Sequence, residues 1–322
     1  MSIGAAASAS YAEAMYRSLL LAVSRGSAVR RAVTGLPVAR RVVDRFVAGE
    51  HAEDALAVTR RLTSAGLAVT IDHLGEHAAD AAAAARTAKA YLVLLDMLAP
   101  LGLGERAEAS VKLSALGQTL GPDGEAVALG HARQICAAAR AAGAAVTLDM
   151  EDHTTVDSTL RVLRRLRADF PETGVAIQSR LLRSEADCRD LAREGARVRL
   201  VKGAYAEPPS VAHQSRSAVD RAYVRCLRTL MEGNGYPMVA THDDRLIAVA
   251  AALAARAGRG RDGYELQMLY GVRPARQRVL AHAGHTVRVY LPYGADWYDY
   301  FARRLAERPA NLAFFLRSLT SV

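Results

Sequence analysis

Near the carboxyl terminus, four residues share a spacing that brings their side chains onto one face of a helix. These residues are Tyr300, Arg303, Arg304 and Glu307. Positions i, i+3, i+4 and i+7 fall on one helical stripe, and Asp296 can cap the helix that carries it. Paired guanidinium groups bind a carboxylate, whereas an acid and a phenol ring suit an ammonium group and an apolar body. The stripe predicts a site for a small zwitterion; the alternative is an exposed helix face with weak ion pairs.

The elements that must position this helix form a repeating pattern. Short apolar runs recur at 68–72, 109–113, 145–149, 175–178, 198–201, 238–241, 265–268 and 287–290. Helical segments lie between them, at 78–98, 124–142, 156–167, 184–194, 215–233 and 246–257. Alternation of strands and helices predicts a parallel sheet covered by helices. Eight units in about 250 residues match a (β/α)₈ barrel, and an open doubly wound sheet is the alternative.

Polar side chains stand at or near the carboxyl end of nearly every predicted strand. They include Asp72, Lys112, Asp149, Gln178, Arg199, Lys202, Thr241 and His242. A charge inside an apolar strand costs several kcal/mol unless it is paired or functional. Barrel enzymes carry their chemistry at the carboxyl ends of the strands. These groups therefore predict one shared pocket, although any single one could be an ion pair that fills the barrel.

The overall charge is basic. Lys and Arg outnumber Asp and Glu by 42 to 33, which gives a formal charge of +9. Such a balance is compatible with nucleic acid, anionic lipid or an anionic cofactor as a partner. The arginines are spread along the predicted helices without a lysine-rich tail or an aromatic-interleaved patch, so we do not expect nucleic-acid binding.

The cysteines and the hydropathy of the chain indicate the cellular compartment in which the protein is expected. Cys136, Cys188 and Cys226 are far apart and form no CxxC pair. We therefore expect reduced, buried thiols in a cytoplasmic protein and no metal site. The apolar run at 19–23 is too short for a secretory signal. No run approaches the ~18–20 apolar residues that span a bilayer.

The chain divides at about residue 65. Residues 1–65 form a helical, arginine-rich pattern with breaks near Gly35 and Gly49, and residues 66–322 carry the barrel pattern. We interpret the first part as a helical cap. Its amphipathic helices could also contact anionic lipid at a membrane surface.

Motifs along the barrel pattern resemble those of proline dehydrogenases, flavoenzymes that oxidise L-proline to Δ1-pyrroline-5-carboxylate. The two longest are Arg-Leu-Val-Lys-Gly-Ala-Tyr at 199–205 and the string from Tyr290 to Arg308. Shorter matches occur in the family's order at 110–114, 148–151, 240–243 and 267–271. The resemblance implies a distorted (β/α)₈ barrel whose last helix lies over the barrel mouth.

The resemblance also implies a substrate site. Arg303, Arg304 and Lys112 would bind the proline carboxylate. The residues around the pyrrolidine ring would be Tyr205, Leu269, Tyr290 and Tyr300. Glu307 would orient the arginine pair or face the amine, and Asp149 would shape the site around Tyr290. A phenol against ring carbon 4 favours proline over hydroxyproline.

The cofactor implied by the resemblance is FAD, which would lie across the strand ends and accept a hydride from proline. Arg199 would sit near flavin N5, where a fixed positive charge stabilises the reduced flavin. The other residues around the cofactor would be Asp149, Gln178, Lys202, Gly203, Ala204, Thr241 and His242. No dedicated catalytic base is evident.

The resemblance is to the monofunctional bacterial enzymes, because the chain leaves no room for the aldehyde dehydrogenase domain of the bifunctional relatives. It implies a membrane quinone as electron acceptor, a functional link to pyrroline-5-carboxylate dehydrogenase, and a cytoplasmic location that allows contact with the inner face of the plasma membrane. Two alternatives are open. One is a dehydrogenase of hydroxyproline or another cyclic imino acid, and the other is a non-enzymatic basic barrel that binds an anionic ligand or nucleic acid.

Overall fold

The computed structural model describes residues 43–298 and residue 300. Eight parallel strands close into a barrel in chain order, and β1 pairs with both β2 and β8. The strands are β1 (Ala68–His73), β2 (Ala107–Val111), β3 (Ala145–Leu148), β4 (Gly174–Gln178), β5 (Arg197–Val201), β6 (Tyr236–Ala240), β7 (Glu265–Leu269) and β8 (Val287–Tyr293). The predicted (β/α)₈ barrel is confirmed, and the open sheet is excluded.

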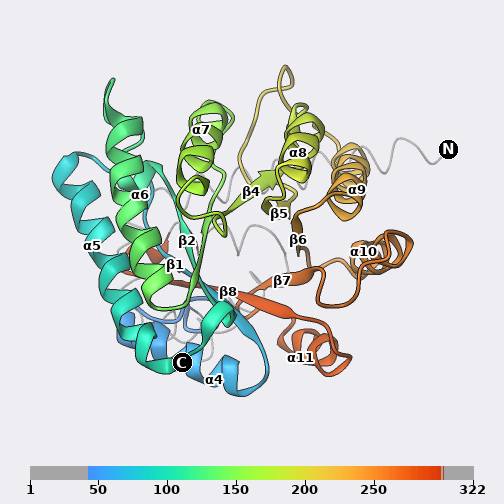
Figure 1. The fold of residues 1–322 in the computed structure, drawn as a ribbon, viewed down its shortest axis with the longest axis horizontal. Helices are drawn as coiled ribbons and strands as arrows, with labels where there is room; N and C mark the ends of the chain where they lie inside the picture. The colour runs from blue at the N-terminus through green and yellow to red at the C-terminus, as the bar shows by residue number, and fades with distance from the viewer. Residues whose placement is uncertain (1–42, 299, 301–322) are drawn as a thin grey trace, which may run out of the picture.

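Helices surround the barrel (Figure 1). They are α4 (Ala52–Ser64), α5 (Ala81–Leu98), α6 (Gly124–Ala141), α7 (Val156–Arg167), α8 (Ser184–Arg193), α9 (Arg216–Glu232), α10 (Asp244–Arg256) and α11 (Pro274–His282). Short 3₁₀ turns occur at Ala99–Leu101, Gly104–Arg106 and Ser114–Leu116. Each helix from α5 to α11 connects one strand to the next strand in the chain, as the crossover between two parallel strands requires.

Helix α4 precedes β1 in sequence yet belongs to the outer ring. It contacts β1, β8 and α5, and in Figure 1 it lies between α5 and α11. Its buried face includes Ala55, Leu56 and Val58. The last part of the predicted cap at 1–65 therefore covers the barrel wall beside β8.

Local capping explains where two helices begin. The Asp80 carboxylate accepts a hydrogen bond from the N–H of Ala83 at 2.7 Å, so α5 starts at Ala81 and not at residue 78 as the pattern predicted. Ser215 caps α9 through the N–H of Ala218 at 3.2 Å. An N-cap residue has extended backbone angles, which place it outside the helix that it stabilises.

Two strand boundaries also differ from the prediction. Lys112 was placed inside the second strand, but β2 ends at Val111 because the chain then enters the tight turn at Ser114–Leu116. The last apolar run was predicted over 287–290, with Pro292 and Gly294 as the break, and β8 continues through Pro292 to Tyr293. Pro292 lacks an N–H, but its carbonyl still accepts from the N–H of Ala48 at 2.9 Å, and the carbonyl of Tyr293 accepts from Leu74 at 2.8 Å.

The two faces of the barrel strands have opposite character. Val69 and Ile71 of β1 are fully buried in the apolar layer between the barrel and its helices. Thr70 and Asp72, the alternate residues, bond to side chains of β2 and its carboxyl end. Because successive side chains of a strand point to opposite faces, the apolar core lies outside the barrel and a polar network fills it.

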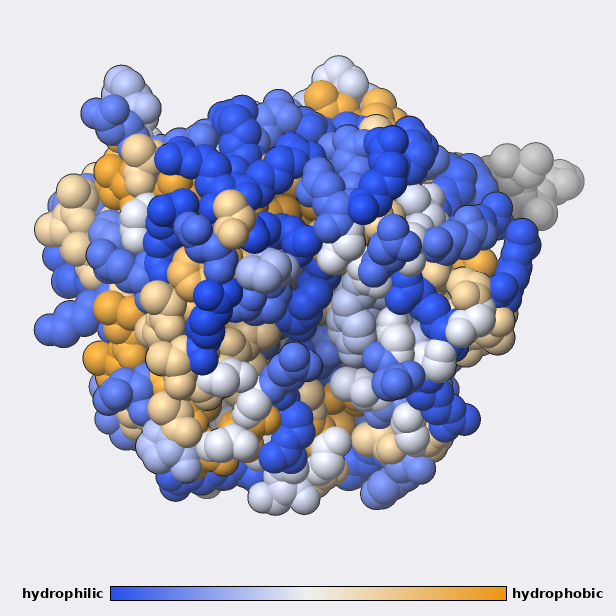
Figure 2. Space-filling view, in the orientation of Figure 1, coloured by the Kyte–Doolittle hydropathy of each residue, from blue (hydrophilic) through white to orange (hydrophobic). Residues whose placement is uncertain are grey.

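The outer surface is largely hydrophilic in the view of Figure 2, with hydrophobic atoms gathered over α5 at its left margin. Val93 of α5 is 45% exposed. None of the helices in the described part of the chain has both the length and the apolar composition that crossing a membrane requires.

Candidate active site

The deepest part of the barrel interior holds paired charges. Arg288 of β8 donates to both carboxylate oxygens of Glu265 of β7, at 2.7 and 3.0 Å. Glu108 of β2 accepts from Nη2 of Arg197 at 3.0 Å and from the hydroxyl of Thr70 at 2.8 Å. These side chains occupy space that branched apolar residues fill in many barrels. Ion pairs thus fill this layer of the barrel.

The Glu108 carboxylate is ionised at any working pH. Burial by itself would raise the pKa of Glu108, but the guanidinium groups of Arg197, Arg288 and Arg199 outweigh burial and lower the pKa to about 2. A carboxyl with a lowered native pKa stabilises the fold fully above its unfolded pKa and loses that contribution as the pH falls through the native value.

Acid unfolding is expected to reveal this contribution. The difference in unfolding free energy between the wild type and Glu108→Gln should shrink by about 3 kcal/mol between pH 4.5 and pH 2, because the pKa falls from 4.5 to about 2 and one unit is worth about 1.4 kcal/mol. Urea unfolding at a series of pH values measures it. A difference that stays constant over this interval would contradict the assigned ionisation.

Asp149, which follows β3, joins side chains from three other strands. Its Oδ1 accepts from Ser110 Oγ at 2.8 Å and from Arg199 Nη1 at 2.6 Å. Its Oδ2 accepts from the Tyr290 hydroxyl at 2.8 Å. Burial and the neighbouring carboxylates hold the pKa of Tyr290 well above its usual value, so Tyr290 remains a phenol that donates. The predicted association of Asp149 with Tyr290 is present.

The guanidinium of Arg199, on β5, is almost completely buried and tightly held. Nε donates to Gln267 at 2.7 Å, Nη1 to Ser110 at 2.7 Å and to Asp149, and Nη2 to Glu108 at 2.6 Å. These bonds use four of the five N–H groups of the guanidinium. Among the described residues, no further acceptor bonds the remaining N–H of Nη2. Arg199 is therefore fixed in place with one donor left for a ligand.

Lys112 lies at the mouth, directly after β2. Its Nζ is 2.5 Å from Oδ1 of Asp72 and 3.7 Å from Oδ2 of Asp149. Burial alone would lower the pKa of Lys112, but these two carboxylates outweigh burial and raise it above its ordinary value. An ammonium has three N–H donors, so Lys112 can hold Asp72 and still donate to an anionic substrate.

Three of the predicted ring-contacting residues, Tyr205, Leu269 and Tyr290, stand at or near the carboxyl ends of their strands. Tyr290 and Leu269 are register partners on β8 and β7, and the Arg199 guanidinium lies 5.3 Å from the Tyr290 ring centroid. Tyr205 follows β5, and its carbonyl accepts from Arg180 at 2.9 Å. Tyr300 is buried.

Three predicted substrate residues lie outside the described part of the chain. They are Arg303, Arg304 and Glu307. The carboxylate clamp therefore stays a prediction, as does the position of most of the last helix.

Predicted cofactor residues lie at the ends of β4 and β5. Gln178 Nε2 donates to the carbonyl of Glu151 at 2.6 Å, and Glu151 is anchored by Ser114. Gly203 has φ of +106°, and a Cβ there would lie 2.9 Å from Gln178 Oε1. Only glycine suits such a position. The backbone at Gly203 and Ala204 thus passes close to Gln178, which brings the ends of β4 and β5 together.

The end of β6 supplies oriented donors. The N–H of Leu269 donates to Nε2 of His242 at 2.9 Å, which leaves the proton of the neutral imidazole on Nδ1. Thr241 Oγ1 accepts from the N–H of Asp243 at 3.2 Å, so its own hydrogen can be donated. Lys202 pairs with Asp220 at 2.5 Å and is partly exposed.

This donor set fits a flavin. The Arg199 guanidinium lies beside Asp149 and Tyr290, and the hydroxyl of Thr241, the imidazole of His242 and the ammonium of Lys202 follow along the neighbouring strand ends. Such donors suit a ligand with an acceptor-rich ring and an anionic diphosphate.

The sequence reasoning named the charges at the mouth but not those beneath them. It did not single out Thr70, Glu108, Arg197, Glu265 or Arg288 as partners. The available signal was alternation, because Glu108 and Arg288 each stand between buried apolar residues of their strands. Alternation indicates the face of the sheet on which a side chain lies, but it does not indicate which other side chain lies in contact with it.

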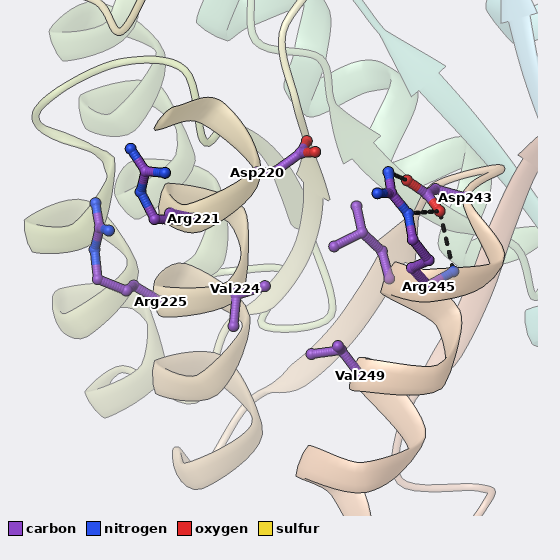
Figure 3. A pocket seen from close by; sticks show the side chains of 8 residues that line it. Asp220, Arg221, Val224, Arg225, Asp243, Arg245 and Val249 are labelled. Atoms are coloured by element: carbon purple, nitrogen blue, oxygen red, sulfur yellow. Dashed lines mark hydrogen bonds and ion pairs between the residues drawn. The ribbon is translucent and has the colours of Figure 1, made fainter. Parts of the chain in front are cut away.

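Surface clefts lie outside the barrel interior in the described part of the chain. One of about 430 Å³ is lined by residues of α9 and α10, and Figure 3 shows Val224 of α9 facing Val249 of α10. Asp220, the partner of Lys202, also lines it. The second, of about 320 Å³, lies between α4 and α11.

The described part of the molecule contains neither a candidate metal site nor a disulfide bond. No cluster of three or more histidine, cysteine or acidic side chains suited to a metal ion occurs in residues 43–298 and 300. The three cysteines are free and buried, as expected.

A (β/α)₈ barrel with a fixed guanidinium, a fixed ammonium and oriented donors at one end defines an enzyme whose active site lies at the carboxyl ends of its strands. The family model described as proline dehydrogenase matches residues 55–317. The chain belongs to the proline dehydrogenase family, and its reaction is the oxidation of proline to pyrroline-5-carboxylate. The family is generally flavin-dependent.

Individual relatives agree with this assignment. The chain is 40% identical over 275 residues to proline dehydrogenase 1 of Bacillus subtilis, covering 85% of this chain and 89% of that protein. It is 40% identical over 280 residues to proline dehydrogenase of Deinococcus radiodurans, covering 86% and 90%.

Solved structures share the fold. Proline utilization A (PutA) of Bdellovibrio bacteriovorus, inactivated by N-propargylglycine, superposes with a TM-score of 0.78 at 24% identity, over 84% of this chain and 33% of that one. A PutA variant of Bradyrhizobium japonicum gives 0.72 at 27% identity, over 87% and 32%. The chain thus spans about a third of these longer proteins.

Proposed function

We propose that the chain is an FAD-dependent L-proline:quinone oxidoreductase whose flavin lies across the ends of β4, β5 and β6. The observation that carries this proposal is Arg199, whose guanidinium is buried, bonded through four N–H groups, and held beside Asp149 and the Tyr290 ring. Bound there, FAD supplies the acceptor for the hydride that proline loses from C5.

Arg199 is the electrostatic element of the site. A reduced flavin carries negative charge, and a preorganised guanidinium stabilises that charge without reorganising during the reaction. Asp149 and Gln267 hold Arg199 from two sides, at 2.6 and 2.7 Å. Around the cofactor, Gln178, Gly203, Ala204, Lys202, Thr241 and His242 complete the proposed set.

Substrate binding is assigned to the part of the mouth near the end of β2, away from the ends of β4, β5 and β6 where the flavin is proposed to lie. Lys112 grips the proline carboxylate together with Arg303 and Arg304. The proposed ring contacts are Tyr205, Leu269, Tyr290 and Tyr300, and Glu307 orients the arginine pair or faces the substrate amine. Tyr290 is fixed by its 2.8 Å bond to Asp149. A fixed phenol at ring carbon 4 leaves little room for a hydroxyl, which favours proline over hydroxyproline.

The wider assignment follows the family. We assign a membrane quinone as the electron acceptor and pyrroline-5-carboxylate dehydrogenase as the enzyme that consumes the product. The proposed location is cytoplasmic, with peripheral contact at the inner face of the plasma membrane, and the proposed division places a helical cap at 1–65 and the barrel at 66–322.

An absorbance spectrum tests the proposal. The purified protein is expected to show a flavin band near ~450 nm, a region where protein side chains do not absorb and bound flavin does. Anaerobic L-proline should bleach the band, and heat-released cofactor should be FAD by chromatography. A matched addition of trans-4-hydroxy-L-proline should bleach it much more slowly. Colourless protein without proline-dependent dye reduction would overturn the proposal, and faster bleaching by hydroxyproline would favour the alternative substrate.

A further inference from the structure

The guanidinium of Arg199 lies between two carboxylates that come from different depths of the barrel. Asp149 meets Nη1 at the mouth, at 2.6 Å, and Glu108 meets Nη2 from the layer beneath, also at 2.6 Å. Asp149 also receives Tyr290 and lies 3.7 Å from Lys112, so it belongs to the substrate site. Within the described part of the chain, the Glu108 carboxylate bonds Thr70, Arg197 and Arg199, none of which is assigned to the substrate.

Glu108 is itself fixed on both oxygens. Its Oε1 accepts from Arg199 and from the hydroxyl of Thr70 at 2.8 Å, and its Oε2 accepts from Arg197 at 3.0 Å. The residue has no exposed surface. A fully buried carboxylate held by three donors is fixed in orientation, and its charge acts at short range with little screening.

We propose that Glu108 is a positioning residue that sets the orientation of Arg199 and lowers the net positive charge facing the flavin. This inference rests on the proposed function. Nε and both Nη atoms of Arg199 are bonded, so the plane of the guanidinium is determined by Gln267, Ser110, Asp149 and Glu108 together. Glu108 is the anion among these that lies on the side away from the substrate groups.

The consequence is a shift of the flavin midpoint potential. A negative charge bonded to Arg199 offsets part of the guanidinium charge, which disfavours the more negative, reduced flavin. Arg197 shares the same carboxylate, so its positive charge acts in the opposite sense. Removing Glu108 should raise the potential, and removing Arg197 should lower it.

The experiment compares flavin-loaded, full-length wild type with Glu108→Gln, by equilibrium titration against a redox dye followed by absorbance. Glutamine keeps an oxygen that can accept from Arg199 but removes the charge. The ratio of reduced to oxidised flavin at a fixed potential is expected to rise about tenfold, equivalent to about 30 mV for a two-electron couple.

Glu265→Gln is the matched control, because Glu265 is an equally buried carboxylate that pairs with Arg288 and is linked to Arg199 only indirectly, through the amide of Gln267. Its flavin ratio should change much less than that of Glu108→Gln. Arg197→Gln changes a more accessible side chain and serves as a second test if Glu108→Gln does not fold. The ratio of reduced to oxidised flavin in Arg197→Gln should fall below that of the wild type.

The outcomes separate this inference from the proposed function. A wild type that proline bleaches, combined with the same potential in Glu108→Gln as in Glu265→Gln, overturns the role of Glu108 and leaves the function intact. An Arg197→Gln variant whose potential rises also overturns it. A wild type without flavin overturns both. Opposite shifts in the two variants support the inference, because a general loosening of the barrel would not change sign between them.

Discussion

Replacing Arg199 by lysine is expected to lower kcat/KM for proline by about 10²–10³-fold, the range found when one preorganised donor to a developing anion is removed. This corresponds to about 3–4 kcal/mol of transition-state stabilisation. The guanidinium makes bonds in three directions, to Gln267, to Ser110 and Asp149, and to Glu108. A lysine ammonium is a compact group on a flexible stem and cannot make that set of bonds. Steady-state kinetics with an artificial electron acceptor measures the loss.

The matched control is Arg288→Lys, which makes the same change one layer deeper, where Arg288 bonds Glu265 and the carbonyl of Val69. Both variants should unfold at lower temperature, because each weakens a buried ion pair. Only Arg199→Lys should lose kcat/KM by orders of magnitude. Equal kinetic losses in the two variants would mean that the barrel interior as a whole, and not Arg199, limits the reaction.

Substitution of Lys112 by methionine is expected to raise KM for proline about 100-fold with a smaller change in kcat. The variant loses a charge-assisted bond to the substrate carboxylate, worth about 1.5–3 kcal/mol. It also leaves Asp72 and Asp149 without the cation that lies 2.5 and 3.7 Å from them, and these carboxylates then repel the substrate. An unchanged KM would contradict the assignment of Lys112 to the carboxylate.

The same variant should acquire a distinctive pH dependence. Burial raises the pKa of Asp72, and Lys112 is the main influence that lowers it, so the pKa should rise further without Lys112. A carboxyl whose pKa is higher in the folded than in the unfolded chain makes the fold less stable as the pH rises through that interval. The free energy of unfolding of Lys112→Met should therefore increase as the pH falls from neutral towards the ordinary carboxylate range.

A double variant separates the two effects of this change. Lys112→Met combined with Asp72→Asn removes the unpaired carboxylate, so it should recover stability at neutral pH and lose the pH dependence. It should not recover the low KM, because the ammonium is still absent. Recovery of KM in the double variant would show that repulsion by Asp72, and not loss of Lys112, weakens proline binding.

Much of the architecture could be predicted from local pattern alone. All eight strands occur where apolar runs alternate with helical segments, because strand and helix periodicity are properties of neighbouring residues. Helix α11 (Pro274–His282) was not among the predicted segments, and the other differences concern boundaries, which depend on interactions that the pattern does not contain. Asp80 caps α5 through its side chain, and Pro292 stays in β8 because Ala48 bonds its carbonyl.

The candidate site divides in a similar way. Charged residues at strand ends predicted a pocket at the mouth, and the structure brings Lys112, Asp149, Arg199 and Tyr290 together there. The same reasoning did not find Glu108, although it too is a charge between apolar neighbours. Its partner Arg199 is 91 residues away, and only closure of the barrel makes them neighbours.

The sequence by itself determined that this chain forms a (β/α)₈ barrel, which end of it carries polar groups, and which family its motifs resemble, because these follow from local periodicity and short strings of residues. The tertiary structure alone decided which charges are paired. Four carboxylates (Asp72, Glu108, Asp149 and Glu265) meet four cations (Lys112, Arg197, Arg199 and Arg288) inside the barrel. Distance and desolvation fix that pairing, and both exist only once β8 has closed against β1.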